Sequence, residues 1–278
     1  LWNLRGQFPG TIGAEIASAE SVLMLEGIDD SLAIARAGNL DANASGFDEV
    51  ARAVRRAESR LRGLDAAIDT LRSYERSANA SDRKAAITSE IVLALVDSGR
   101  VDEALQEARR LASTYEGTEW ASWAEQATYE LQSLMPGMEA PPITARTWSG
   151  ATFALETDGT GTVVLEFFRP GESAFLREVA VRDSLVRAMV GRGIKYVSIS
   201  VEPDSVINEA FFESRGGPDV RIALSGGLED SVAQAYNVRV VPRRFLLNNG
   251  TIVGKYSGTG SLQALGQDVF DLAARPPS

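Results

Sequence analysis

The 278-residue sequence contains no cysteine and no histidine. Without a thiol or an imidazole, the chain cannot form a disulfide, a thiolate nucleophile, a Ser-His-Asp triad or an imidazole metal site. The enzyme classes that depend on these groups are therefore excluded. Cysteine usage also gives no information on the compartment, because there is no thiol that could be oxidised.

Lysine is scarce as well. It occurs only at Lys84, Lys195 and Lys255, so arginine supplies most of the 28 basic residues. Acidic residues number 38, and the formal net charge is −10. A nucleic-acid groove needs concentrated positive charge, and binding to anionic lipid needs a cluster of basic residues. We therefore expect no nucleic acid among the partners.

Long apolar runs are missing too. No stretch reaches the roughly 18 consecutive apolar residues of a transmembrane helix. We expect no membrane span in this chain. A signal peptide or lipid anchor would precede Leu1. The expected location is the periplasmic side of a membrane, with attachment through such an upstream segment left open.

Two regions of different composition make up the chain. Residues 10–135 are rich in Ala, Leu, Arg and Glu, with apolar residues at helical spacing. A proline-rich segment, 136–142, ends this pattern, because proline stops a helix and favours extended chain. We predict a helical domain over 1–135 and an α/β domain over 136–278.

Helical periodicity in the first domain is strongest over residues 46–79, which predicts one long amphipathic helix. Further along, the segment from Asp97 to Leu105, DSGRVDEAL, resembles the central turn of a tetratricopeptide repeat. Gly99 would permit the tight turn, and the small Ala104 would let two helices approach closely. Such repeats usually bind proteins on a concave face. A plain helical bundle that serves as a spacer is the alternative.

After the boundary, Val/Ile-rich runs alternate with helical patterns. The sequence predicts a central, largely parallel sheet covered by helices on both faces. The expected strands are 152–155, 162–168, 196–201, 220–224, 244–247 and 252–256. The expected helices are 175–190, 204–214, 228–236 and 261–272.

Several motifs of this half resemble the TlpA-like thiol–disulfide oxidoreductases of the thioredoxin superfamily. The entry segment Pro136-Gly137-x-x-Ala140-Pro141, the strand Val163–Phe168 and Ala235-Tyr236-Asn237-Val238 follow the family in order and spacing. Val241-Pro242 falls at the position of the family's cis-proline. Asn248-Asn249-Gly250 falls at its final hairpin, and Asn-Gly is itself a strong hairpin signal. The resemblance implies a thioredoxin fold.

The same resemblance places the two redox cysteines at Glu172 and Phe175, with Ser173 and Ala174 between them. Thiol–disulfide exchange needs a thiolate and a leaving sulfur, so the domain is expected to be redox-inactive and to need no cofactor. Glu172 could cap the following helix or contact a cationic group of a partner. Pro242 could keep the family's cis bond and its peptide-binding edge, or could merely separate two strands.

The leading hypothesis from the sequence is a non-catalytic binding or scaffolding subunit of a membrane protein complex. The residues Glu172, Ser173, Ala174, Phe175, Val241 and Pro242 form its candidate interaction surface. One alternative is a chaperone-like binder of extended polypeptides at the Pro242 edge. The other is an enzyme that uses acidic residues on this frame.

Overall fold

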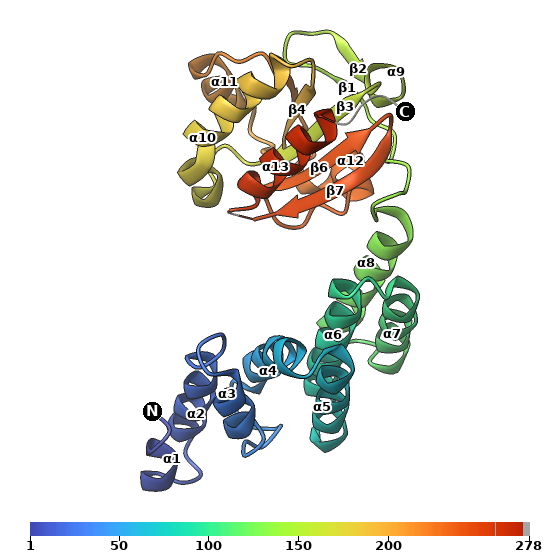
Figure 1. Ribbon diagram of the computed structural model, residues 1–278. Coiled ribbons are helices and arrows are strands. Elements are labelled where there is room, and N and C mark those ends of the chain that lie inside the picture. The colour runs from blue at the N-terminus through green and yellow to red at the C-terminus, as the bar shows by residue number, and fades with distance from the viewer. Residues whose placement is uncertain (259, 275–278) are drawn as a thin grey trace. The chain divides into compact units, whose positions relative to one another are not determined.

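The computed structural model describes residues 1–258 and 260–274, and the chain forms two compact units, Leu1–Leu131 and Gln132–Ser278 (Figure 1). The division lies a few residues before the predicted boundary at Pro136. Helix α8 (Glu119–Ser133) crosses it, so the proline-rich segment follows the last helix of the first unit.

The first unit is helical, as the sequence predicts. Its helices are α1 (Leu4–Gln7), α2 (Ile12–Leu23), α3 (Asp30–Ala37), α4 (Phe47–Leu61), α5 (Leu64–Ser77), α6 (Ser81–Asp97), α7 (Val101–Thr114) and α8. Helices α2, α4 and α6 begin at Ile12, Phe47 and Ser81, so a helix pair recurs about every 35 residues. A tetratricopeptide repeat has about 34 residues. This period favours a repeat array over an irregular bundle.

The single long helix predicted over 46–79 is wrong. Helix α4 ends at Leu61 and α5 begins at Leu64, and between them Gly63 has a φ of 90°. Glycine adopts such left-handed backbone at little cost, whereas other residues are strained there. Both helices bury an apolar face, which includes Val50 and Leu71, so the apolar spacing continues across the break and conceals it.

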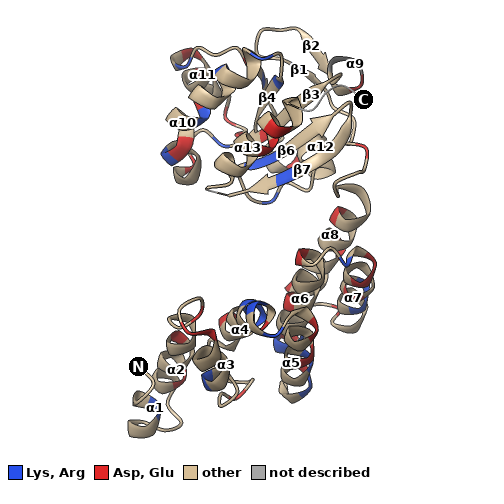
Figure 2. Cartoon of the chain, viewed as in Figure 1, with Lys and Arg blue, Asp and Glu red and all other residues tan. Residues whose placement is uncertain are grey.

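Several ion pairs between successive helix pairs repeat with the same period. Four of them join partners 35 positions apart: Arg55–Glu90 (2.9 Å), Asp65–Arg100 (2.6 Å), Arg72–Glu107 (2.8 Å) and Glu75–Arg110 (2.9 Å). These pairs join α4 to α6 and α5 to α7. Acidic and basic residues line these helices in Figure 2. The arginine-rich composition thus provides guanidinium groups that link one helix pair to the next.

Glu107 gives a test of these links. Its carboxylate accepts hydrogen bonds from both Arg72 and Arg110 and is largely buried. Burial alone would raise the pKa of Glu107. Arg72 and Arg110 lower the pKa by more than burial raises it, so the carboxylate stays charged. Glu107→Gln should reduce the free energy of unfolding by roughly 2 kcal/mol, measured by urea denaturation, because both guanidinium groups lose one of their two carboxylate partners and keep only Glu75.

The matched control is Glu103→Gln, one helical turn earlier. The Glu103 side chain is 53% exposed and pairs with Arg100 at the surface. Its loss should leave the urea midpoint almost unchanged. An equal effect of the two substitutions would show that the buried links do not contribute to stability.

The second unit is built on a mixed sheet with strand order β5-β4-β3-β6-β7. The strands are β3 (Thr162–Phe168), β4 (Lys195–Ser200), β5 (Val220–Ala223), β6 (Arg243–Asn248) and β7 (Thr251–Ser257). Strands β3, β4 and β5 are parallel, but β6 is antiparallel to both of its neighbours. The prediction of a largely parallel sheet is therefore wrong for β6 alone, since β7 runs in the same direction as β3. The hairpin that the sequence predicts at Asn249–Gly250 is confirmed, and it makes β6 and β7 antiparallel.

Three helices of this unit match predicted segments closely: α10 (Ser173–Val190), α11 (Ser205–Ser214) and α13 (Ser261–Ala273). The helix predicted over 228–236 is divided into the 3-10 turn η1 (Gly227–Glu229) and α12 (Ser231–Ala235), and the sequence did not predict α9 (Leu155–Asp158). The expected strand over 152–155 is β2 (Thr152–Ala154). It pairs with β1 (Thr144–Arg146), a strand that the sequence did not predict.

Strand β3 is buried on both faces and separates two cores. Val163, Leu165 and Phe167 pack with residues of the β1–β2 hairpin and α12. Val164 packs on the other face with residues of α10 and α13. Because side chains alternate along a strand, Glu166 points to this second face, and it is fully buried there.

Candidate functional site

Three of the candidate positions, Glu172, Ser173 and Ala174, lie where the loop after β3 leads into α10. Glu172 is the N-cap residue of α10, with extended backbone, and Ser173 and Ala174 form the first helical positions. Ser173 is exposed, while Glu172 and Ala174 are half-buried. The Glu172 side chain makes no capping hydrogen bond. Its carboxylate therefore does not carry out the capping role that the sequence allowed.

Phe175 behaves differently from its three neighbours. Its side chain is fully buried and stacks on Phe168, with ring centroids 4.6 Å apart and an interplanar angle of 26°. Phe211 of α11 also contacts it, at 5.7 Å between centroids. The position that the resemblance assigns to the second cysteine is thus part of an aromatic core, and is not available to a partner.

The Val241–Pro242 peptide bond is cis, as the resemblance predicts, while the peptide-binding role of this position stays a prediction. Pro242 is buried and Val241 is half-buried, whereas the preceding Val240 is 65% exposed. Phe167 near the end of β3 pairs with Arg243 at the start of β6. Because of this register, the loop after β3 and the cis bond lie at the same end of the sheet, where β3 ends and β6 begins.

Near this end of the sheet, the buried Glu166 side chain of β3 lies between two arginines. Arg182 of α10 donates to its Oε2 at 2.6 Å, and Arg244 of β6 donates to its Oε1 at 2.8 Å. The three side chains are between 0 and 4% exposed. A buried carboxylate is costly unless it is paired and hydrogen-bonded, and both conditions are met here.

Each arginine also has partners beyond Glu166. Arg244 donates to Glu178 and to the Ser261 hydroxyl, and so connects β6 with both α10 and α13. Arg182 donates to the Ser198 hydroxyl, and Ser198 in turn donates to Asp219. We call Glu166, Glu178, Arg182, Ser198, Asp219 and Arg244 the buried ionic network.

The electrostatics of the network keep Glu166 and Asp219 ionised. Burial alone would raise the pKa of Glu166, but the charges of Arg182 and Arg244 lower it by more, so the pKa lies below the ordinary value of 4.5. Asp219 follows the same pattern, because Arg182 and the Ser198 hydrogen bond outweigh its burial. Glu178 pairs with Arg244.

Sequence reasoning missed this network. A signal for it was present, because Glu166 interrupts the apolar strand VVLEFF, and Arg243-Arg244 begins the strand after the cis bond. A charge inside an apolar strand predicts either an exposed edge or a buried partner. The partner Arg244 lies 78 positions away, so no local pattern identifies it.

The described residues contain no group of three or more acidic side chains placed to hold a metal ion. Among the helices of residues 1–258 and 260–274, none is long and apolar enough to cross a membrane.

No protein-family model and no curated protein matches the sequence. Among solved structures, a thioredoxin-like protein from Bacteroides caccae ATCC 43185 is similar, with a TM-score of 0.54 and 14% identity. The match covers 81% of this chain and 80% of that one. It shows that the fold is thioredoxin-like, as the sequence motifs predict.

Shorter matches cover about half of this chain. A putative thiol:disulfide interchange protein DsbE from Chlorobium tepidum aligns over 51% of this chain and 100% of its own, with 17% identity and a TM-score of 0.46. The thioredoxin domain of a thiol-disulfide oxidoreductase from Bacteroides vulgatus aligns over 49% and 99%, with 21% identity and a TM-score of 0.44. This chain contains no cysteine, so it cannot perform thiol–disulfide exchange.

Substitution of Glu166 tests the network. Glu166→Gln should reduce the free energy of unfolding by about 3 kcal/mol at pH 7, because two buried guanidinium groups lose their shared carboxylate. Glu209→Gln, at an exposed position on α11, is the control and should have little effect.

The pH dependence gives a second readout for the same variant. A carboxylate with a lowered pKa in the folded state stabilises the protein above its unfolded pKa, and the effect is lost as pH falls through the folded pKa. The difference between wild type and Glu166→Gln should therefore shrink below pH 4.5. A difference that stayed constant from pH 7 to pH 3 would contradict the ionised pairing of Glu166.

Proposed function

We propose that this protein is a non-catalytic binding subunit, an extracytoplasmic accessory component of a membrane protein complex. The observation that carries the proposal concerns the four positions that match the family's redox loop, residues 172–175. One of them is buried and three are accessible. Phe175 fills the core, while Glu172, Ser173 and Ala174 remain accessible beside the cis bond before Pro242. An accessible surface beside the cis bond, in a chain without cysteine, supports a role in binding.

The residues around this edge suit contact with a protein. Val240 and Leu176 expose 65% and 49% of their surfaces. Glu172 adds a carboxylate that makes no capping bond. An apolar patch with a charged rim is typical of a protein–protein interface. We define the interaction surface as Glu172, Ser173, Ala174, Leu176, Val240 and Val241.

The helical unit supports the same function. Recurring helix pairs of this length usually present a surface for protein partners. A chain with a helical array and a redox-inactive thioredoxin-like unit has two modules suited to binding. The extracytoplasmic location is part of the proposal and rests on the resemblance to thiol–disulfide oxidoreductases.

Site-specific photo-cross-linking tests this proposal. A photoreactive benzoyl-phenylalanine in place of Ser173 or Val240 should cross-link the same membrane protein in the producing organism. Detergent extraction should recover that protein in stoichiometric amount with the wild-type chain. The added Val240→Asp substitution should reduce the Ser173 cross-link several-fold, because it places a charge in the apolar part of the interaction surface.

The matched control places the photoreactive group at Arg192, an exposed residue just after the far end of α10. By the helical rise this position is roughly 25 Å from Ser173, and it should give no such product. Equal cross-linking from Arg192, or a protein that is recovered only as a free monomer, would contradict the proposal.

A further inference from the structure

A groove lies on the helical unit between α5 and α7, the second helices of two successive helix pairs. Helix α6 packs against both of them (Figure 1). The groove holds a cavity of about 350 Å³, and sites for ligands usually have volumes of about 300–1,000 Å³. Ile91 and Leu95 of α6 are buried beneath the cavity, so α6 forms its floor. Polar and charged side chains of α5 and α7 form its walls.

Ion pairs cross this groove at regular intervals. Asp65 accepts a hydrogen bond from Arg100 at one end, and Arg72 donates to Glu107 further along α5. In both pairs the second residue lies 35 positions after the first. These links hold the two walls together, so the groove is formed before any ligand arrives.

One position in this series has no partner. Asp69 lies on α5 between Asp65 and Arg72, roughly one helical turn from each. The residue 35 positions after Asp69 is Ala104, which is fully buried and carries no charge. Asp69 is exposed, lines the cavity, and forms no hydrogen bond or ion pair within residues 1–258 and 260–274. Its carboxylate therefore faces the groove without a cation.

The cations already in the groove are not available to Asp69. Arg72, Arg100 and Arg110 line the cavity, and each of them pairs with two carboxylates. The carboxylates of the lining, which are Asp65, Asp69, Glu103 and Glu107, outnumber these cations by one. The charge that is left over is that of Asp69, so the groove is complementary to a cation.

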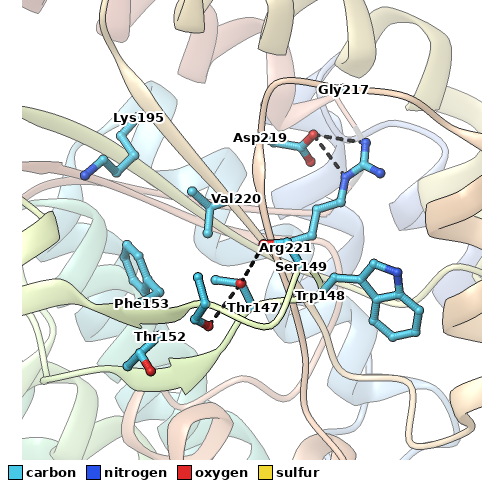
Figure 3. A pocket seen from close by; sticks show the side chains of 11 residues that line it. Thr147, Trp148, Ser149, Thr152, Phe153, Lys195, Gly217, Asp219, Val220 and Arg221 are labelled. Carbon is cyan, nitrogen blue, oxygen red and sulfur yellow. Dashed lines mark hydrogen bonds and ion pairs between the residues drawn. The ribbon is translucent and has the colours of Figure 1, made fainter.

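The cavity of the α/β unit differs in this respect. It has a volume of about 510 Å³ and opens between the β1–β2 hairpin and the start of β5 (Figure 3). Its carboxylate, Asp219, already pairs with Arg221 and Arg182. Lys195 also interacts within the chain. The charged side chains of that cavity are thus engaged, whereas Asp69 is not.

We propose that the groove between α5 and α7 binds an arginine side chain of a partner protein. The guanidinium group pairs with Asp69 and supplies the cation that position 104 lacks. Gln106 also lines the cavity and is exposed, so its amide oxygen accepts a second hydrogen bond. A guanidinium group carries five donors in a planar fork, which suits a carboxylate and an amide oxygen at once. The apolar stem of the arginine lies along the half-buried Ile68.

Arginine binding in this groove rests on the binding role proposed for the helical unit, and it is independent of the interaction surface on the α/β unit. The two tests therefore fail separately. Loss of the cross-link from Ser173 would leave arginine binding by the groove intact, and loss of arginine binding would leave the cross-link intact.

Titration with Nα-acetyl-argininamide tests the site, followed by the backbone amide signals of α5 and α7 in a protein NMR spectrum. This probe should shift the signals saturably. The neutral isostere Nα-acetyl-citrullinamide should bind about tenfold more weakly, because it lacks the charge that pairs with Asp69. Free L-arginine should bind no more tightly than the blocked probe, since its own carboxylate gains no partner in the groove. Tighter binding of the free amino acid would overturn the assignment to a protein partner.

Asp69→Asn should weaken binding of Nα-acetyl-argininamide about tenfold, whereas Asp69→Glu should retain most of it. The control is Glu20→Gln, at an exposed position on α2, which should leave binding unchanged. Unchanged amide spectra outside α5 and α7 would show that each variant still folds. The absence of a saturable shift, equal binding of the citrulline analogue, or full binding by Asp69→Asn would each overturn the proposal.

Discussion

A carboxylate enclosed between two guanidinium groups holds the centre of the α/β unit together. Glu166 belongs to the central strand β3, and its partners Arg182 and Arg244 belong to α10 and β6. Arg244 reaches on to Glu178 and Ser261, so one set of charges joins the sheet to both helices on one face. Each member needs the others, because an unpaired charge at this depth would be strongly destabilising.

This network and the aromatic core beside it hold the start of α10 to the sheet. In the TlpA-like family that the sequence resembles, two redox cysteines follow the strand that corresponds to β3. Here Phe175 occupies the second of these positions and stacks on Phe168 inside the core. The first turn of α10 is thus held from below by aromatic packing and by ion pairs further along the helix. The residues above it, Glu172 to Ala174, remain accessible next to a cis peptide bond. An accessible surface on a rigid base is the result.

The sequence predicts the strands and helices better than the contacts between buried side chains. The strand over 162–168 and the helices of the α/β unit come from apolar periodicity, and the cis position of Pro242 comes from the family's motif order. The break at Gly63 was missed because both flanking helices bury a similar face. The pairing of Glu166 with Arg244 was missed because it joins residues 78 positions apart. Charge pairing across a sheet follows from tertiary packing, which local spacing does not contain.

Hydrogen exchange at the amides of the first two turns of α10 tests the rigid base most directly. If the buried ionic network and the Phe168–Phe175 stack hold this helix to the sheet, the amides from Leu176 to Val179 should exchange only when the whole α/β unit unfolds. Their opening free energy should then equal that of the β6 amides from Phe245 to Leu247. Exchange of the α10 amides through a separate, lower-energy opening would show that the network does not hold the start of α10 in place.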